Sequence, residues 1–443
     1  YGEDNCTPAN TLNTTLAVIR ADENPGNTYP GGAPAHQSVV VTCDEQGQDV
    51  PVQIWLSDAA GNTDFCVAYV NVQANAVGCT QGTQAAEAGV LATEIQQGIE
   101  QSNVQLVSSG PAGQQYVTVQ QSNDLGVFVF PNAVPMNSDY TLTPLKDDNP
   151  LNGVTTYDLV LISKHILGLE PLTTPYKIIA ADANRSGSIT TFDIVEFRKL
   201  ILGVYSELPN NTSWRFVDKS YVFPQPSNPF QAVFPENISA QDVAADRLTE
   251  NFVGVKIGDV NNTMIANTLQ SAEERTAATM LFDVEDRTVK NGEVFTVHFK
   301  GAERVQGYQF TMNLNGLEMM SIAPGANTDL SNFGVFPDAI TTSVDGDANE
   351  FDITFRAVKA GRISAMLGVS SRITKAEAYP VPGASSWGAT DRMDVAFRFN
   401  GAAGSVISGV GFELYQNQPN PFVNKTFIGF HLPEATSATL RVF

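Results

Sequence analysis

The sequence predicts a mainly β, multi-domain protein in which tandem β-sandwiches flank one small α-helical module. Three observations lead to this prediction. At 443 residues the chain exceeds one ordinary domain, so about three to five domains are expected. Short apolar runs, bounded by Gly, Asn and Asp, recur along most of the chain and are typical of strands and turns. One stretch near the middle instead carries the apolar spacing of an amphipathic helix, and it does so twice.

The chain is strongly acidic, with 47 Asp and Glu against 25 Lys and Arg and a net charge of −22. This balance disfavours nucleic acid and anionic membrane as partners, because both require a basic surface. It fits a protein that binds divalent cations, and it equally fits a generally acidic secreted protein. No apolar run approaches the ~20 residues that cross a bilayer. Because the chain starts at Tyr1 without Met and stops at Phe443 within a strand pattern, we expect a piece of a longer protein.

Residues 1–80 predict a small β-module. "SVVVTC", "VPVQIWLSD" and "CVAYVNVQA" have strand character, and "DAAGNTDF" predicts a turn. The four cysteines of the chain all lie here, at Cys6, Cys43, Cys66 and Cys79. Their clustering predicts disulfides, of unknown pairing, and an oxidising location; a zinc site is disfavoured because no CxxC pair is present. The phrase "DAAGNTDFCVAYVNV" resembles HYR-type modules of bacterial surface proteins, which implies an immunoglobulin-like sandwich.

Residues 81–145 predict a second β-module. "GVLATEIQQGIEQSNVQLVSS" is followed by "DLGVFVFPNAVPMNSDYTLTPLK", with the rhythm of strand, glycine turn and strand. This segment resembles the carboxypeptidase-regulatory-like, transthyretin-like sandwich. The resemblance implies a spacer without chemistry of its own.

Residues 146–270 begin with a duplication. "DDNPLNGVTTYDLVLISKHILG" starts at Asp147, and "DANRSGSITTFDIVEFRKLILG" starts at Asp182, so the two copies align without a gap at a shift of 35 residues. Each copy predicts an acidic loop and then an amphipathic helix, ended by Gly168 and Gly203. Neither unit can bury its apolar face alone, so we expect the two helices to pack on each other.

The second loop predicts a calcium site. An EF-hand-type loop needs oxygen ligands at positions 1, 3 and 5, a backbone carbonyl at 7 and a carboxylate at 12. With Gly187 at the turn, the loop supplies them as Asp182, Asn184, Ser186, the carbonyl of Ser188, and Asp193. Within "SITTFD", Thr190 and Asp193 also predict a helix-capping box, which is compatible with metal binding.

The first loop is less regular. Its predicted ligands are Asp147, Asn149, the backbone of Leu151 and Gly153, and Asp158. Leu151 at position 5 offers only a carbonyl, Pro150 stiffens the loop, and Asp148 or Asn152 is an alternative ligand. We therefore expect two bound Ca²⁺ ions, with the first ligand set less well defined.

Two calcium loops, each followed by one helix, resemble the type I dockerin in the form found in Bacteroidota. The resemblance implies binding of a cohesin through one helix face. The rest of the segment, to residue 270, is rich in Pro, Asn and aromatics and predicts ordered loops. In "NFVGVKIGDVNNT" a strand runs into an acidic turn, where Asp259 or Asn261 is either an added ligand or part of a plain polar turn.

Residues 279–402 predict a third sandwich of about nine short strands. "DRTVKNGEVFTVHFKG" and "VQGYQFTMNLNG" resemble the opening strands of a cohesin. A dockerin-like and a cohesin-like module in one chain permit either docking within the chain or head-to-tail assembly into filaments. "SVDGDANEFD", with Asp345, Asp347 and Asn349, lacks the turn glycine of a calcium loop and is interpreted as a hairpin turn.

Residues 411–443 carry "LYQNQPNPFVNKTFIGFHLPEATSATLRVF". This phrase resembles the start of the type A C-terminal sorting domain of the type IX secretion system, with its hallmark at Asn417, Pro419, Asn420, Pro421 and Phe422. The resemblance implies export by the type IX machinery, followed by release or attachment at the outer cell surface.

The chain contains no HExxH, GxSxG, GxGxxG or Walker pattern. We therefore interpret it as a non-enzymatic, secreted, calcium-stabilised protein of the cell surface or of an extracellular filament, with a role in adhesion. Its expected partners are the secretion machinery and modules of the same or neighbouring chains, with a homo-oligomer as one outcome. Two alternatives remain: the non-catalytic C-terminal region of an exported hydrolase, and a cellulosome-like scaffold subunit.

Overall fold

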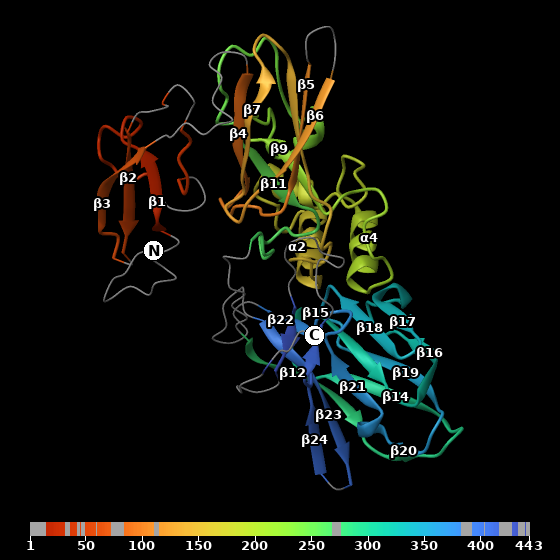
Figure 1. The fold of residues 1–443 in the computed structure, drawn as a ribbon. Helices are drawn as coiled ribbons and strands as arrows, with labels where there is room; N and C mark the ends of the chain where they lie inside the picture. Colours follow the sequence, from red (N-terminus) through yellow and green to blue (C-terminus); the bar gives the residue numbers. More distant parts are fainter. Residues whose placement is uncertain are drawn as a thin grey trace. The chain divides into compact units, whose positions relative to one another are not determined.

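The computed structural model describes residues 15–31, 36–41, 45, 49–58, 60–71, 84–109, 115–267, 276–381, 392–402, 404–415, 428–432 and 439. The chain divides into two compact units. One consists of Tyr1–Lys146, Trp214–Lys256 and Ile265–Ser271, and the other of Asp147–Ser213, Ile257–Met264 and Ala272–Phe443. The predicted fold class is confirmed, because most described elements are strands in several sheets, and the described α-helices between residues 156 and 201 form a small module in the middle of the chain (Figure 1).

The first unit opens with a three-stranded antiparallel sheet of β1 (Ala17–Arg20), β2 (Asp49–Ser57) and β3 (Thr63–Asn71). Its core contains the buried indole of Trp55, which stacks on Phe65 with ring centroids 4.3 Å apart. Cys66 in β3 is a free and exposed thiol, so the disulfide expected at this residue is not found. The other three cysteines lie outside the described residues.

The first unit continues with two four-stranded sheets, ordered β10-β8-β5-β6 and β7-β4-β11-β9. Their bounds are β4 Gln84–Thr93, β5 Asn103–Ser109, β6 Gln115–Gln121, β7 Val127–Pro135, β8 Tyr140–Leu145, β9 Trp214–Asp218, β10 Ile238–Ala240 and β11 Phe252–Lys256, with a short 3₁₀ helix, η3, at Pro229–Gln231. β9, β10 and β11 come from the segment that the sequence predicted as an irregular extension of the helical repeat. The predicted boundary between these two domains is therefore corrected. The prediction failed because β11 pairs in parallel with β4, Phe252 opposite Leu91, and such non-local pairing has no short-range signal.

The second unit begins with the duplicated loops and helices. α2 (Thr156–Ile166) and α4 (Thr191–Ile201) each start with a capping box, Thr155 with Asp158 and Thr190 with Asp193. A short helix that was not predicted, α3 (Pro175–Ala180), lies between them and has Thr174 as its N-cap. As expected, α2 and α4 pack on each other and end at left-handed glycines. We call α2, α4 and their loops the helical repeat.

The rest of the second unit is one β-sandwich, here called the C-terminal sandwich. Its strands are β12 Thr276–Glu285, β13 Thr288–Val289, β14 Val294–Gly301, β15 Val305–Leu314, β16 Leu317–Ala323, β17 Phe333–Phe336, β18 Ala339–Val344, β19 Glu350–Ala357, β20 Gly361–Arg362, β21 Leu367–Ser370, β22 Glu377–Pro380, β23 Arg392–Gly401 and β24 Gly404–Ser408. Two 3₁₀ helices, η4 (Leu330–Asn332) and η5 (Ile363–Ala365), and a separate pair, β25 (Glu413–Leu414) with β26 (Phe430–His431), complete the description. The main strand order is β16-β19-β14-β12-β23-β22-β15-β18-β17. Its core is a cluster of fully buried phenylalanines that includes Phe282, Phe310, Phe355, Phe397 and Phe399.

The strand order corrects one prediction in this sandwich. Residues 345–349 connect β18 to β19, and these two strands pair with different partners rather than with each other. The segment is therefore a crossing connection and not a hairpin turn. Among the described residues, no helix has the length and apolar character that crossing a membrane requires.

Candidate functional site: acidic loops and a helix–sheet interface

The second acidic loop folds around the carboxylate of Asp182. Its Oδ1 accepts a hydrogen bond from Ser186 N at 2.9 Å, and its Oδ2 accepts one from Gly187 N at 2.8 Å. The side chain of Asn184 also turns inward and accepts from Ser186 N at 3.0 Å. Arg185 and Gly187 take positive φ values of 57° and 76°, which tighten the loop around these oxygens. The side chains predicted at positions 1 and 3 therefore converge on the backbone amide of Ser186, the residue predicted at position 5.

Asp193 joins this loop from the first turn of α4. Its Oδ2 accepts from Thr190 N at 2.8 Å and caps the helix, while its Oδ1 lies 3.4 Å from Asn184 N. Burial raises the pKa of Asp193, and the nearby Asp182 raises it further. One oxygen therefore serves the cap and the other faces the loop, so helix capping leaves one oxygen of Asp193 directed to the loop. Two buried carboxylates held together are stabilised when a cation lies between them.

The donor set of this loop suits calcium. The described residues contain no group of three or more His, Cys, Asp and Glu side chains that could hold a metal. A cation here would rest on two carboxylates with hard amide, hydroxyl and carbonyl oxygens, the ligands that Ca²⁺ prefers and that softer transition metals do not. The residues Asp182, Asn184, Ser186, Ser188 and Asp193 thus fit the predicted ion.

The first acidic loop has a different geometry. Asp147 Oδ1 accepts from Ser213 N at 2.7 Å, outside the loop, and it accepts no described bond from an amide of its own loop. Asn149 takes the left-handed conformation, with φ 46°, one residue earlier than Arg185 does in the second loop. Pro150 accounts for this difference because its ring fixes φ near −65° and forbids a left-handed fourth position. The sequence-predicted role of Asp147 as first ligand is therefore not supported.

Asp158 is nevertheless placed as Asp193 is. It is fully buried at the start of α2, and its Oδ2 accepts from Thr155 N at 2.9 Å. Its Oδ1 accepts from Val260 N at 2.9 Å, in a segment distant in sequence. Burial raises the pKa of Asp158 well above its ordinary value, and the neighbouring Asp259 raises it further. The acidic turn at Asp259 therefore adjoins the first helix. From the sequence alone, this turn was either a source of an added ligand or a plain polar turn.

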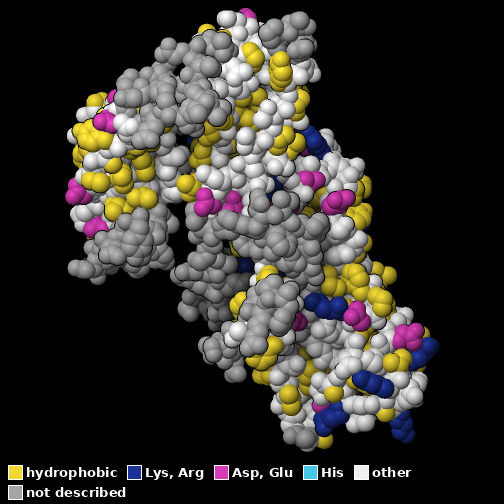
Figure 2. All heavy atoms as spheres, in the orientation of Figure 1, with side chains coloured by type: hydrophobic (Ala, Val, Ile, Leu, Met, Phe, Trp, Pro, Cys, Tyr) yellow, Lys and Arg dark blue, Asp and Glu magenta, His cyan; other side chains and the backbone are white. Residues whose placement is uncertain are grey.

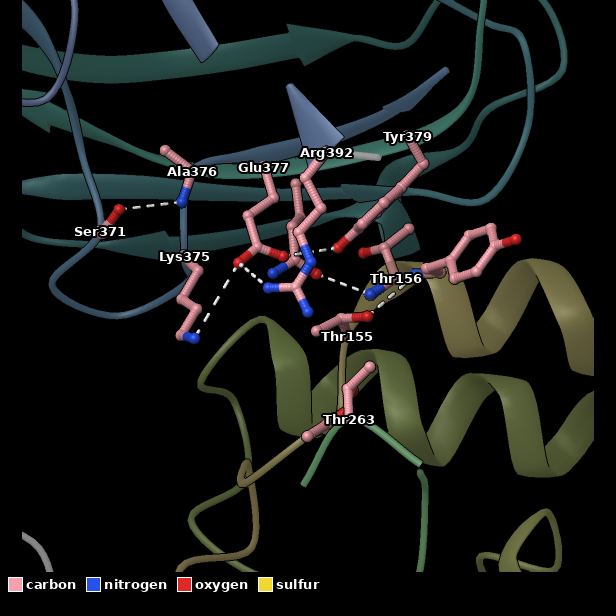
Figure 3. Close-up of polar contacts among 12 residues, drawn as sticks. Thr155, Thr156, Thr263, Ser371, Lys375, Ala376, Glu377, Tyr379 and Arg392 are labelled. Atoms are coloured by element: carbon pink, nitrogen blue, oxygen red, sulfur yellow. Dashed lines mark hydrogen bonds and ion pairs between the residues drawn. The ribbon is translucent and has the colours of Figure 1, made fainter. Parts of the chain in front are cut away.

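The N-terminus of α2 packs on the C-terminal sandwich through buried polar contacts (Figure 3). Thr156 N donates to Gln309 Oε1 in β15 at 2.6 Å, and Thr156 Oγ1 lies 2.7 Å from Ser343 Oγ in β18. The ring of Tyr157 lies 5.2 Å from that of Tyr379 in β22. Gln309 thus satisfies an amide of the first helical turn that has no partner within the helix.

The C-terminal end of α4 packs on the same sandwich. The carbonyls of Ile201 and Leu202 accept from Thr374 Oγ1 at 2.6 Å and Thr341 Oγ1 at 2.7 Å. The last carbonyls of a helix also lack intrahelical partners. Both helices therefore present their unsatisfied ends to threonine and glutamine side chains of the C-terminal sandwich, with Thr374 in the connection between β21 and β22.

A buried polar cluster around one carboxylate borders this interface (Figure 3). Glu377 in β22 accepts from Arg392 Nη1 at 3.2 Å and from the hydroxyl of Tyr379 at 3.1 Å. Burial raises the pKa of Tyr379 strongly, and the charge of Glu377 adds to this effect. The Tyr379 hydroxyl is thus a permanent donor that fixes Glu377 beside the helix.

Sequence reasoning did not anticipate the sandwich residues of this interface, which lie in strands or in their connections: Gln309, Thr341, Ser343, Asp345, Thr374 and Glu377. The one local signal was "AITTSV" in β18, where a strand that is buried along its whole length contains three adjacent hydroxyl residues. Buried hydroxyl groups require hydrogen-bond partners, so such a run indicates a polar partner element. The predicted sorting motif at Asn417, Pro419, Asn420, Pro421 and Phe422 lies outside the described residues.

The outer surface of the C-terminal sandwich carries basic side chains that are paired with acidic ones. Figure 2 shows Lys and Arg side chains beside Asp and Glu on this module. Among them, Lys300 pairs with Glu350 at 2.8 Å, and Arg398 pairs with Asp283 at 2.6 Å. Basic groups paired in this way do not form the uncompensated positive surface that nucleic acid requires.

Comparisons with known proteins give weak similarity only. No family model and no curated protein matches the chain. A non-cellulosomal cohesin from Archaeoglobus fulgidus is 16% identical over 30% of this chain and 92% of its own, with a TM-score of 0.18. CaCohA2 from Clostridium acetobutylicum is 11% identical over 31% of this chain and 92% of its own, with a TM-score of 0.17. BcpA, the major pilin subunit of Bacillus cereus, is 8% identical over 75% of this chain and 70% of its own, also with a TM-score of 0.17. Because these TM-scores are so low, the functional inference is based on the geometry of this chain alone.

Proposed function

We propose that this chain is a non-enzymatic, secreted structural protein of the cell surface, in which a calcium-ordered helical repeat serves as a rigid internal joint. The observation that carries the proposal is the docking of α2 and α4 onto the C-terminal sandwich of the same chain. Thr156 meets Gln309 and Ser343 at one end, and Leu202 meets Thr341 at the other.

This interface is suited to a permanent joint. The buried amide of Thr156 and the carbonyls of Ile201 and Leu202 are each satisfied by one side chain of the sandwich, which favours a single relative placement of helices and sandwich. A dockerin-like helix face that is covered by the chain's own cohesin-like module is not available to a second chain. The geometry therefore favours a stalk or an adhesin over a filament built by cohesin–dockerin exchange.

Calcium ions would hold the loops from which the helices start. An ion that binds only the folded loops stabilises the fold by mass action, by about 2.7 kcal/mol at a hundredfold excess over Kd. The melting temperature should therefore be higher in calcium than in chelator. Asp182→Asn should reduce this difference, whereas Asp347→Asn, in the crossing connection, should leave it unchanged. Identical melting of the wild type in calcium and in chelator would contradict the calcium part of the proposal.

The joint itself is tested by multi-angle light scattering over a concentration series, with calcium and with chelator. We expect a monomer in both conditions, because the docking partners belong to one chain. Mass that grows with concentration in calcium would contradict the internal joint and would support exchange of the helical repeat between chains. Arg198→Glu distinguishes these two arrangements further. In a monomer it should separate the helical repeat from the C-terminal sandwich of the same chain, and in an exchanged assembly it should return the chains to monomers.

Export by type IX secretion is the proposed route to the surface. Its support is the sequence phrase around Asn417 to Phe422. The test compares a type IX-competent host with its secretion mutant, using the full chain and a variant with residues 411–443 removed. Protein in the medium or on the surface of the competent host only, and for the full chain only, is the expected result. Equal export of both chains would overturn this route.

A further inference from the structure

A third acidic segment folds like the first half of the second loop. Asp259 Oδ1 accepts from Thr263 N at 3.2 Å, and its Oδ2 accepts from Met264 N at 2.7 Å. In the second loop, Asp182 accepts from the amides of the fourth and fifth residues after it in the same way. Asp259 therefore has the local geometry expected of a first calcium ligand, although the next described element after its segment is a strand, β12.

The backbone of the segment matches as well. Asn262, three residues after Asp259, has a φ of 62°, and Arg185, three residues after Asp182, has a φ of 57°. Two independent stretches of chain thus make the same left-handed turn at the same distance from an aspartate. Met264, rather than glycine, follows at the sixth position.

The other half of the loop comes from the start of α2. Thr263 Oγ1 donates to the carbonyl of Gly153 at 3.1 Å, just as Ser186 Oγ donates to the carbonyl of Ser188 at 3.1 Å. Gly153 is the counterpart of Ser188 in the 35-residue repeat. The segment at Asp259 and the segment before α2 are therefore joined by a hydrogen bond equivalent to the one that closes the second loop.

The carboxylate that completes the arrangement is Asp158, the counterpart of Asp193. It is buried beside Asp259, which is also buried, and its Oδ1 is directed to the amide of Val260. A further oxygen lies two residues after Asp259: Asn261 Oδ1 is buried and accepts no hydrogen bond within the described part of the chain. A buried carbonyl oxygen without a hydrogen-bond partner destabilises the fold unless a ligand occupies it.

We propose that the first calcium site is split, formed by Asp259, Asn261 and Thr263 together with the carbonyl of Gly153 and the carboxylate of Asp158. This inference rests on the proposed calcium-dependent joint and reassigns one of its two sites. The contiguous first loop is unsuited because Asp147 is used by Ser213, Pro150 forbids the left-handed turn and Leu151 has no side-chain oxygen.

The split site has a structural consequence. Asp158 and Val260 are 102 residues apart in sequence, so an ion here cross-links the beginning of α2 to a distant segment of the same unit. Cross-links that close long loops stabilise the folded state mainly by restricting the unfolded chain. The second loop, being contiguous, gives no such closure.

Calcium titration by isothermal calorimetry tests this assignment on the full chain and on three aspartate variants. We expect two sites in the wild type, loss of one in Asp259→Asn, loss of the other in Asp182→Asn, and two retained in Asp147→Asn. Melting with and without calcium should show the same order, with the larger loss in Asp259→Asn. Loss of a site in Asp147→Asn, with two retained in Asp259→Asn, would overturn the split site in favour of the contiguous loop.

Two further results keep the assignment falsifiable. If Asp259→Asn does not fold, Asn261→Ala removes a ligand without touching the amide-binding carboxylate, and it should weaken one site at least tenfold. Unchanged affinity in that variant counts against the split site. A wild type that binds one ion, lost in Asp182→Asn, would refute the split site and leave the second loop intact, whereas no binding at all would refute both.

Discussion

The guanidinium of Arg198 in α4 lies 2.5 Å from the carboxylate of Asp345, at the end of β18, and the two side chains are only 12% and 13% exposed. Asp345 also accepts a hydrogen bond from Ser163 of α2 at 3.1 Å. One carboxylate of the C-terminal sandwich therefore contacts both helices of the repeat. Ser163 and Arg198 occupy equivalent positions in the two copies of the repeat. The two helices therefore contact Asp345 through equivalent positions.

Removal of Arg198 should be among the most destabilising single changes at this interface. Arg198→Ala leaves a largely buried Asp345 without its cation, which typically costs about 3–5 kcal/mol for a fully buried pair and somewhat less here. Lys300→Ala breaks a pair whose side chains are 61% and 45% exposed, so it should change the free energy of unfolding very little. Urea unfolding of both variants checks the ranking, and an Arg198→Ala effect as small as that of Lys300→Ala would contradict it.

Glycine at position 307 allows α2 to approach β15 closely. A Cβ atom at this position would lie 2.8 Å from the carbonyl oxygen of Val344 and 3.1 Å from Val160 Cγ2. Gly307→Ala should therefore act as a wedge between helix and sheet and lower the free energy of unfolding by about 1–3 kcal/mol. Gly346→Ala is the matched control, since a Cβ there meets nothing within 4 Å. Equal melting temperatures for the two variants would show that the helix is not packed on Gly307.

Gln309 is the sheet side chain that accepts from the first turn of α2, at 2.6 Å from Thr156 N. Gln309→Ala leaves this buried amide without a partner, which costs about 1–3 kcal/mol. Hydrogen exchange at Thr156 should accelerate accordingly. Thr296→Ala, which removes a hydrogen bond between two exposed threonines, serves as control. Unchanged protection of the Thr156 amide would indicate that the amide has another partner.

Glu87 in β4 gives the first unit a predictable pH dependence. Its carboxyl group is fully buried, neither oxygen has a described hydrogen-bond partner, and burial raises its pKa to about 8. The titratable groups that face it are Tyr140, Arg247, Glu250 and Asp246. An acid whose pKa is raised on folding is stabilising in its protonated form, so its contribution is complete below pH 4.5 and is lost as the pH rises to about 8.

Glu87→Gln should therefore stabilise the first unit at pH 8, by roughly 2–4 kcal/mol, and should have no such effect at pH 4. Thermal melting across this range measures the difference. Glu318→Gln, which removes a carboxylate from an exposed ion pair, controls for the change in net charge. A Glu87→Gln curve parallel to that of the wild type would show that Glu87 is ionised in the folded protein.

Much of the local structure could be predicted from the sequence. The two helices, their capping threonines at 155 and 190, and their glycine ends follow from short-range rules, because each depends on residues within one or two turns. The geometry of the second loop follows for the same reason, since its donors lie within twelve consecutive residues. In the first loop, Pro150 by itself indicates stiffness, whereas its exclusion of a left-handed fourth position becomes evident only by comparison with the turn of the second loop.

The remaining features depend on residues that meet only in the folded chain. β11 joins β4, Thr263 reaches Gly153, and Asp345 contacts both copies of the repeat across long sequence separations. An aspartate in a turn or a hydroxyl residue in a strand gives no short-range signal of such a distant contact.

The sequence by itself therefore determined the duplication, the helices, the strand-rich modules and one complete loop. Only the tertiary structure decided which strands share a sheet, which face of the repeat is covered and which aspartate stands opposite Asp158. The physical reason is that helix caps and loop turns are set by local hydrogen bonds, whereas sheet pairing and buried polar contacts are selected by packing of the whole chain.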